Sequence, residues 1–503
     1  MEPLTTPSGQ PAPPWRIYLA AGRSVAALIG RTAITKAMGM AGGILLSRLL
    51  LPRDFGLFAV VNLFLGAVSI VGDLGMTGVL VQQREEPTTH QLRAIFSFQL
   101  VLAVAAALLM ALLASLAARP YHLGQEGVWL VRFTGVYLVA DAFRSIPTAL
   151  LTRQVRFSRA VRADVVAAAS YQVLTVAGAW AGLGAWALSL GLVGNAVAGA
   201  VVMQLLARWP MGLAWDWRVI RNSTAFGAFL QGAQTLAAVE LSSAAVLVGW
   251  LAGPTALGYM AFALTVASTP MLIATMLSKV AFPSLARLQE DRERLGGALG
   301  LSVRVCIYAQ GALTLPLLLM PGQVIVVVFS ARWLPAAHLV LLMGVAWFIR
   351  GFAGLGLVAW NSLGWSALTF WFHAALTGAS WSLALALVRI AGSTGVAEAW
   401  LLASLPLPVV LLVVRGSVHF SLRSSVLLPL CPLLVALGLG LLPWPYIQAM
   451  PPAVLLLVKV PALWLVYGAV FVAVERSTLR QVLDALRAGG MTRWLLARRD
   501  AAA

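Results

Sequence analysis

Among the charged side chains that lie within long apolar stretches of this 503-residue chain, Arg31, Lys36, Glu240 and Arg350 are the candidates for a functional site. Charge is costly inside a hydrocarbon layer, so such side chains are expected to face a polar interior or a pathway. Arg can donate two parallel hydrogen bonds to one phosphate group, whereas Lys acts as a point charge. The residue types therefore predict that Arg31, Lys36 and Arg350 bind an anionic group, with phosphate as the best match.

Each of these predictions has a plainer alternative. Arg31 lies near the start of its apolar stretch, where its side chain could instead reach lipid phosphate at the membrane surface. Arg350 lies deeper in its apolar stretch, beside Gly351 and Gly354, which favours a cavity. Small neighbours around Lys36 also favour a cavity over lipid. Glu240 is expected either to pair with one of these cations or to bind a coupling proton or sodium ion.

Two further carboxylates have a structural interpretation. Asp73 and Asp141 stand near the ends of apolar stretches, and Arg144 follows Asp141 at helical spacing. These three residues are predicted to stabilise a bundle. The five histidines, together with Cys306 and Cys431, show no metal-ligand spacing, and the sequence contains no nucleophile elbow or phosphate-cradling glycine loop. We therefore expect no metal, no cofactor and no enzymatic activity.

The composition shows what must position these residues. With 60% hydrophobic residues, 10% charged residues and a mean hydropathy of +0.89, the chain cannot form one water-soluble core. Its apolar stretches have the length that crosses a bilayer as an α-helix. The net charge of +18 is scattered through short connections, which argues against nucleic acid as a partner. The sequence predicts an all-α integral membrane protein surrounded by membrane lipids.

About fourteen transmembrane helices are expected. The predicted spans are 26–47, 56–80, 94–118, 128–150, 163–182, 185–207, 224–250, 256–281, 301–320, 336–358, 366–388, 395–414, 426–442 and 452–474. Most Arg and Lys residues of the connections fall on one side, which predicts that both termini are cytoplasmic. In the connection after the sixth span, Trp209, Trp215 and Trp217 are expected at the membrane interface.

A short pattern occurs twice. Residues 51–59 read LPRDFGLFA and residues 252–261 read AGPTALGYMA, so that Pro, Gly four residues later and then Ala recur about 200 residues apart. Six predicted spans separate the copies, an even number, which gives both halves the same orientation and a pseudo-twofold axis along the membrane normal. Two six-helix lobes of this kind enclose a central cavity that can open to either side. A chance recurrence of a turn signal is the alternative.

The sequence is predicted to divide as follows: 1–25, cytoplasmic N-terminal tail; 26–207, N-lobe with spans 1–6; 208–223, cytoplasmic inter-lobe linker; 224–414, C-lobe with spans 7–12; 415–474, spans 13 and 14; and 475–503, an amphipathic cytoplasmic tail on the membrane surface.

Several passages also resemble a known family, the polysaccharide-transport branch of the multidrug/oligosaccharidyl-lipid/polysaccharide exporter superfamily, called Wzx-type flippases. The passages are LLSRLLLPRDFG at 45–56, DLGM through LVQQ at 73–83, LLTRQVRF at 150–157, and GPTALGY at 253–259 followed by AFPSLARLQ at 281–289. One departure is that the seventh span has Ala244 and Trp250 where relatives carry an acidic residue and an Arg. We therefore do not infer a charged site in the seventh span of this chain from its relatives.

The resemblance implies a MATE-like fold of twelve core helices plus two. It also implies translocation of undecaprenyl-diphosphate-linked oligosaccharide across the bacterial inner (cytoplasmic) membrane during exopolysaccharide, capsule or O-antigen (lipopolysaccharide) assembly. A polysaccharide polymerase and a chain-length regulator are the candidate protein partners; the oligomeric state is left open. The alternatives are an ion-coupled multidrug antiporter of the same fold and a polytopic polysaccharide-synthesis enzyme.

Overall fold

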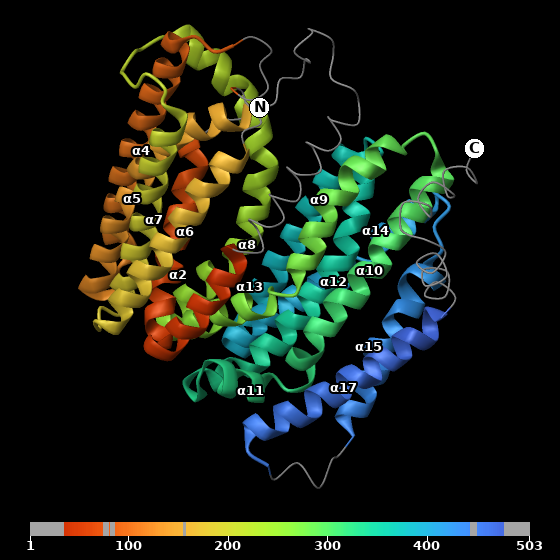
Figure 1. Cartoon of the computed structure of the whole chain (residues 1–503). Coiled ribbons are helices and arrows are strands. Elements are labelled where there is room, and N and C mark those ends of the chain that lie inside the picture. Colours follow the sequence, from red (N-terminus) through yellow and green to blue (C-terminus); the bar gives the residue numbers. More distant parts are fainter. Residues whose placement is uncertain (1–34, 74–79, 81–85, 154–156, 443–449, 477–503) are drawn as a thin grey trace. The chain divides into compact units, whose positions relative to one another are not determined.

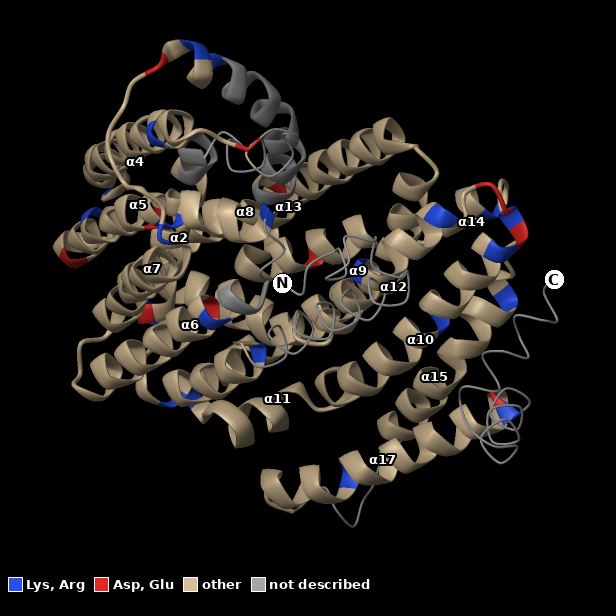
Figure 2. Ribbon diagram, turned by 45° about the horizontal axis from the view of Figure 1, so that its top comes forward, with Lys and Arg blue, Asp and Glu red and all other residues tan. Residues whose placement is uncertain are grey.

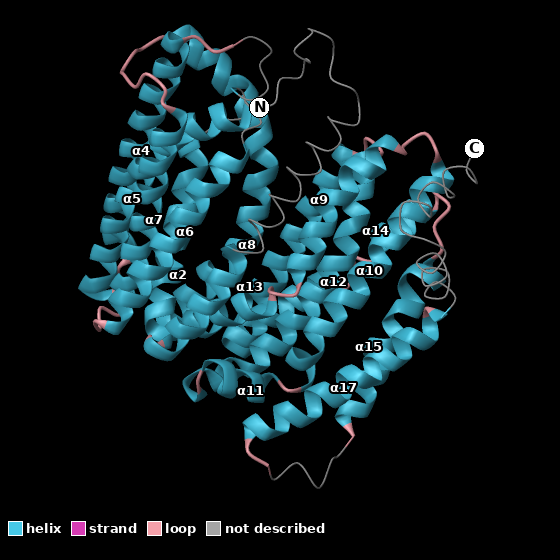
Figure 3. Cartoon of the chain, in the orientation of Figure 1, coloured by secondary structure: helices cyan, strands magenta, loops and turns pink. Residues whose placement is uncertain are grey.

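A computed structural model of the chain describes residues 35–73, 80, 86–153, 157–442 and 450–476. Helices make up nearly all of this part of the chain, joined by short loops (Figures 1 and 3). The side chains of 69–73, 157–159 and 222–238 are outside the description. The all-α fold class predicted from the composition is confirmed.

Helix ends coincide with residues that satisfy the terminal backbone groups. Pro52 is the first residue of α2 (Pro52–Asp73), where its missing N–H costs nothing, and Asp54 Oδ2 accepts the N–H of Leu51 at 2.8 Å. The side chain of Thr88 caps α4 (Thr89–Ala117) by accepting from the backbone of Gln91.

Eight described segments are long and apolar enough to cross a membrane. They are Thr89–Ala117, Ala185–Ala207, Val239–Ala267, Arg292–Leu319, Ala331–Ser362, Ser366–Arg415, Arg423–Leu441 and Pro452–Val474. The total of fourteen spans stays a prediction.

Two long helices each contain one residue with non-helical backbone angles, at a place where the sequence predicts the end of a span. In α8 (Trp217–Ala267), Gly253 has φ 76°, and in α13 (Ser366–Ser404), Gly392 has φ 59°. Only glycine adopts such angles without strain. These breaks fall between the predicted spans 224–250 and 256–281, and between 366–388 and 395–414.

The chain forms two compact units, each made of several sequence segments. The first comprises residues 1–263, 328–339 and 370–400. In it α4 packs on α5 (Gly124–Arg153), and α7 (Ala185–Ala207) packs on both α5 and α6 (Phe157–Trp180), while α2 lies against α4 and α5 (Figure 1).

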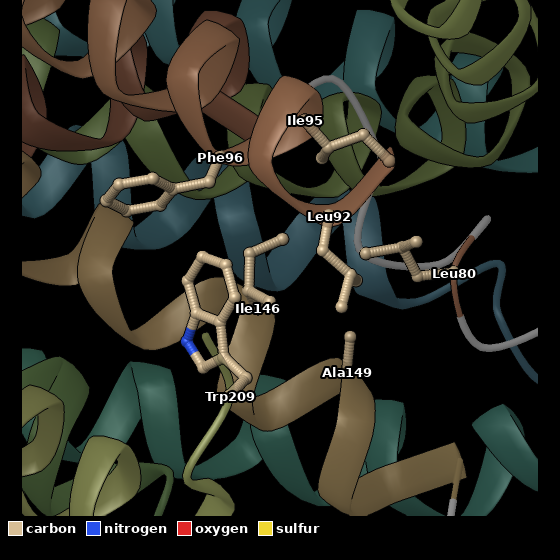
Figure 4. Packing of buried hydrophobic residues seen from close by; sticks show 7 residues of the cluster. All are labelled: Leu80, Leu92, Ile95, Phe96, Ile146, Ala149 and Trp209. Atoms are coloured by element: carbon tan, nitrogen blue, oxygen red, sulfur yellow. The ribbon is translucent and has the colours of Figure 1, made fainter. Parts of the chain in front are cut away.

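The connection after α7 is fastened to this bundle by Trp209. Arg208 ends α7 in the left-handed conformation, and the indole of Trp209 is 7% exposed within a cluster of α4 and α5 residues (Figure 4). The Arg93 Nε donates to the Pro210 carbonyl at 3.1 Å. The indole of Trp209 thus packs against protein, whereas Trp215 and Trp217 are exposed. The interfacial position of the three residues stays a prediction.

The second unit comprises residues 264–327, 340–369 and 401–503. Its central helix is α10 (Arg292–Leu319), which packs against α9 (Met271–Arg287), α15 (Leu428–Leu441) and α17 (Pro452–Val474). It also contains α11 (Pro321–Val324), most of the π-helix η1 (Ile325–Phe329), most of α12 (Ala337–Ser362), α14 (Val409–Arg415) and the π-helix η3 (Arg423–Leu427). The short 3-10 helix η2 (Ala331–Ala336) belongs to the first unit.

Candidate functional site

Long stretches of the described helices carry no charged residue (Figure 2). Of the predicted cations, Arg31 lies outside the described residues, and Lys36 is exposed on the helix of residues 35–49. Asp73 ends α2, and its side chain lies outside the description. The roles predicted for these residues stay predictions.

Glu240 lies in a buried polar cluster between α8 and α13. Its side chain is among the few buried charged ones, at 5% exposed, and Ser380 Oγ lies 3.5 Å from Glu240 Oε1. One turn further along α8, Ser243 Oγ donates to the Glu240 carbonyl and accepts the indole N–H of Trp400 at 3.0 Å. The indole of Trp381 donates to the Val239 carbonyl at 3.1 Å. The carboxylate of Glu240 thus lies beside the buried hydroxyl of Ser380, and the hydroxyl of Ser243 contacts the Glu240 backbone.

Arg350 lies in the second unit, on α12. Its Nε donates to Ser404 Oγ at 2.8 Å, and Ser404 is fully buried. The neighbouring Gly351 allows Gln310 of α10 to approach closely, and Gln310 donates its amide to the Trp347 carbonyl at 3.0 Å. A half-buried guanidinium held by a hydroxyl can still donate to a phosphate.

Arg144 forms an ion pair that the sequence spacing does not indicate. Its guanidinium binds Asp164 of α6, and the side chains are 22% and 11% exposed. Gly199 of α7 leaves room for the guanidinium, because a Cβ there would lie 3.1 Å from a terminal nitrogen. The pair ties α5 to α6, in line with the structural role predicted for Arg144; the role of Asp141 stays a prediction.

The two copies of the repeated pattern meet face to face. A Cβ on Gly56 would overlap the carbonyl oxygen of Pro254, and a Cβ on Gly258 would overlap that of Pro52. The Gly of each copy therefore touches the Pro of the other copy, as a local twofold axis requires. Small residues permit this close backbone approach. We call this contact the motif crossing.

The indole of Trp333 lies beside the motif crossing. Trp333 of η2 is fully buried and stacks on Phe262 at 4.3 Å between ring centroids, with Phe55 edge-on at 4.9 Å. Its indole N–H donates to the Ser47 carbonyl at 2.7 Å. An aromatic residue within the first copy, Phe55, and one directly after the second, Phe262, thus both pack against Trp333.

Two arginines tie the same region together. Arg48 donates through Nε and Nη2 to the Val328 carbonyl, at 3.2 and 3.0 Å. Arg332 Nη1 donates to the Leu50 carbonyl at 3.1 Å. The bonds run in both directions between residues 47–50 and 328–333. Sequence reasoning missed both arginines, because each lies in a connection and interrupts no apolar stretch.

A second missed group lies in the second unit, where α10 meets the end of α17. Glu475 is 8% exposed, accepts from Tyr308 at 2.9 Å and pairs with Arg304 at 3.3 Å. The Tyr467 hydroxyl donates to the Tyr308 carbonyl at 2.8 Å. The sequence placed Glu475 at the start of the C-terminal tail. The only available signal was an acidic residue directly after a long apolar helix.

Comparisons with known proteins agree with this architecture. Residues 45–338 match the family described as "Polysaccharide biosynthesis protein". The succinoglycan biosynthesis transport protein ExoT of Rhizobium meliloti (strain 1021) is 25% identical over 460 residues, covering 88% of this chain and 91% of that protein. The resemblance to the polysaccharide-transport branch is thereby confirmed.

Solved structures show the same fold. The lipid II flippase MurJ in an inward closed conformation has a TM-score of 0.72 at 12% identity, covering 89% of this chain and 98% of that chain. An inward-facing multidrug resistance MATE family transporter of the MOP superfamily has a TM-score of 0.60 at 15% identity, covering 79% and 98%. The chain is thus a multi-pass membrane protein with a MurJ- and MATE-like fold, and it belongs to the polysaccharide biosynthesis protein family.

Proposed function

We propose that this protein is a flippase that moves an undecaprenyl-diphosphate-linked oligosaccharide across the bacterial inner membrane by alternating access. The observation that carries the proposal is the motif crossing, where the glycines of both copies of a repeated pattern lie against each other's carbonyls. A contact related by a twofold axis can close one end of a pathway and open as its two sides rotate apart. Family membership and the name of the 25% identical relative support transport of a polysaccharide precursor.

In this proposal the motif crossing closes the outer end, because the predicted orientation places the connection at 51–54 opposite the cytoplasmic termini. Arg31, Lys36 and Arg350 bind the diphosphate on its way across, since charge at bilayer depth requires a partner. No covalent bond of the substrate changes during transport. Only the position of the substrate, the conformation of the protein and the protonation state of the coupling residue change.

Glu240 is the coupling residue of the proposal. Its carboxylate can accept a proton, or it can bind a sodium ion together with the hydroxyl oxygen of Ser380, since hard cations prefer oxygen ligands. Glu240→Gln is expected to remove the dependence of transport on an ion gradient, while Ser284→Ala, an exposed hydroxyl on α9, leaves it unchanged. If transport by Glu240→Gln still depended on the ion gradient, Glu240 would not be the coupling residue.

The function is tested in the source bacterium. Deletion is expected to abolish polymer output and to leave lipid-linked oligosaccharide on the inner leaflet. Complementation by the wild-type chain restores output, and Arg350→Ala does not. A matched control is Arg389→Ala, an exposed arginine of α13. If the deletion strain makes normal polymer but loses resistance to cationic drugs, the protein is a multidrug antiporter instead.

A further inference from the structure

The guanidinium of Arg132 lies at the surface of the first unit, where α4 and α5 pack along each other (Figure 1). Its Nη2 donates to the hydroxyl of Ser115 on α4 at 2.9 Å. Its central carbon lies 4.9 Å from the ring centroid of Trp129, one turn earlier on α5. The hydroxyl and the aromatic face are both neutral partners. Within the part of the chain that the structure describes, neutral groups therefore hold this charge in place, and no ion pair neutralises it.

The charged residues close to Arg132 in sequence do not compensate it either. Glu126, in the first turn of α5, lies 3.5 Å from Arg53 and is used in that ion pair. Arg119 is exposed and follows Ser115 by four residues, in a turn that continues the helical hydrogen bonding of α4. Residues four apart share one face of a helix, so Arg119 adds a second positive charge beside the first. Two cations that share a surface attract an anion.

The side chains around this point are apolar and exposed. Leu112 and Leu116 of α4 are 70% and 74% exposed, and Val136 is exposed one turn after Arg132 on α5. The exposed apolar face of α4 continues toward its other end through Leu109, Leu108, Val104 and Val101. Acyl chains are the solvent that suits such a face on a membrane protein. The surface thus joins a fixed cation to an apolar track.

The dimensions of this surface fit one leaflet of a membrane. Val104 precedes Ser115 by eleven residues, which is about 16 Å along a helix that rises 1.5 Å per residue. Half of a hydrocarbon core is about 15 Å. The predicted span 94–118 ends three residues after Ser115, and the predicted span 128–150 begins four residues before Arg132. The predicted spans therefore place the cation near the headgroups and the apolar track along the acyl chains.

We propose that Arg132, Trp129 and Ser115 form a binding site for one anionic phospholipid at the outer end of α4 and α5. The lipid phosphate accepts hydrogen bonds from the guanidinium, which has five N–H donors and uses one on Ser115. The ring of Trp129 fixes the plane of the guanidinium, and an acyl chain lies along α4. A lipid with net negative charge is favoured, because a choline or ethanolamine group would bring another cation close to Arg119. The inference does not depend on the proposed transport function.

The test is photo-crosslinking with phosphatidylglycerol that carries a diazirine on one acyl chain. Full-length protein in phosphatidylcholine nanodiscs with a small fraction of this probe is irradiated, and the crosslinked peptides are identified by mass spectrometry. Crosslinks are expected to concentrate on residues 104–116. Phosphatidylcholine with the same diazirine should give about tenfold less crosslinking there, which corresponds to about 1.4 kcal/mol in affinity. Equal crosslinking by the two lipids would mean that this face is only solvated by lipid, and would overturn the proposal.

Substitutions show whether the site depends on the fixed guanidinium. Arg132→Gln is expected to lower the phosphatidylglycerol crosslink about tenfold, whereas Arg389→Gln, which removes an exposed arginine of α13, should leave it unchanged. Arg132→Lys keeps the charge but loses the planar fork, so it should also lower the crosslink, and it serves if Arg132→Gln fails to fold. Wild-type crosslinking by either Arg132 variant, or an equal fall in Arg389→Gln, would overturn the proposal.

Competition identifies the source of the phosphate. Excess unlabelled phosphatidylglycerol is expected to remove the crosslink to residues 104–116, and inorganic phosphate at the same concentration should leave it in place. Removal by inorganic phosphate would make a free anion the ligand. Removal by geranylgeranyl diphosphate at a lower concentration than phosphatidylglycerol would make a polyprenyl diphosphate the ligand. Either result overturns the assignment of this site to a phospholipid, and neither affects the flippase function.

Discussion

Replacing the crossing glycines by alanine should open the outer end of the protein. Each added methyl group would overlap a backbone carbonyl, Gly56→Ala that of Pro254 and Gly258→Ala that of Pro52. Backbone cannot move aside as a flexible side chain does, so the segments must separate. Overpacking of this kind costs about 1–3 kcal/mol. Alanine also favours a helix over glycine by about 1 kcal/mol, but that gain is present in both states and cancels.

The ratio of closed to open molecules should therefore fall about 5- to 150-fold for each substitution, because about 1.4 kcal/mol corresponds to tenfold. The assay is labelling of Ser47→Cys, a position that is 1% exposed, by an impermeant maleimide in a chain whose native cysteines are both replaced by Ala. Gly66→Ala on the same helix is the control, since a Cβ there meets no atom within 4 Å. Labelling of Gly56→Ala and Gly258→Ala at the rate of Gly66→Ala would refute the crossing as a closed contact.

Three further predictions test the packing of each unit by thermal unfolding of purified protein. Glu475→Gln should destabilise the second unit by about 2–4 kcal/mol, because Arg304 would lose its buried carboxylate; an unchanged Tm would contradict a stabilising role. Asp164→Asn should likewise lower the Tm, and adding Arg144→Met should recover part of the loss by removing the stranded charge; no recovery would argue against direct coupling. Trp209→Ala should cost about 3–5 kcal/mol, whereas the exposed Trp215→Ala should cost far less; equal losses would contradict the buried cluster.

The sequence was sufficient for the fold class because composition and span length leave helices as the main solution in lipid. It also predicted the repeat, since Pro52 and Gly56 recur as Pro254 and Gly258. It could not show that the copies touch, because the spacing within a copy contains no information about its contact partner. That information depends on how helices far apart in the chain pack.

The candidate site was predicted less completely, for a similar reason. Charges inside apolar stretches stand out, so Glu240 and Arg350 were identified, and the structure gives each a buried hydroxyl within 3.5 Å. Charges in connections do not stand out, so Arg48 and Arg332 were missed. Helical spacing suggested only local partners for Arg144, whereas the ion pair with Asp164 joins two helices.

The most direct test of the account is translocation by the purified chain. Proteoliposomes are prepared with a fluorescent undecaprenyl-diphosphate-linked oligosaccharide, and an impermeant quencher reports how much of it lies in the outer leaflet over time. The account predicts that the wild-type chain accelerates exchange between leaflets far beyond protein-free vesicles, and that crosslinking the motif crossing stops it. Exchange no faster than in protein-free vesicles, with correctly folded wild-type protein under an imposed ion gradient, would contradict it.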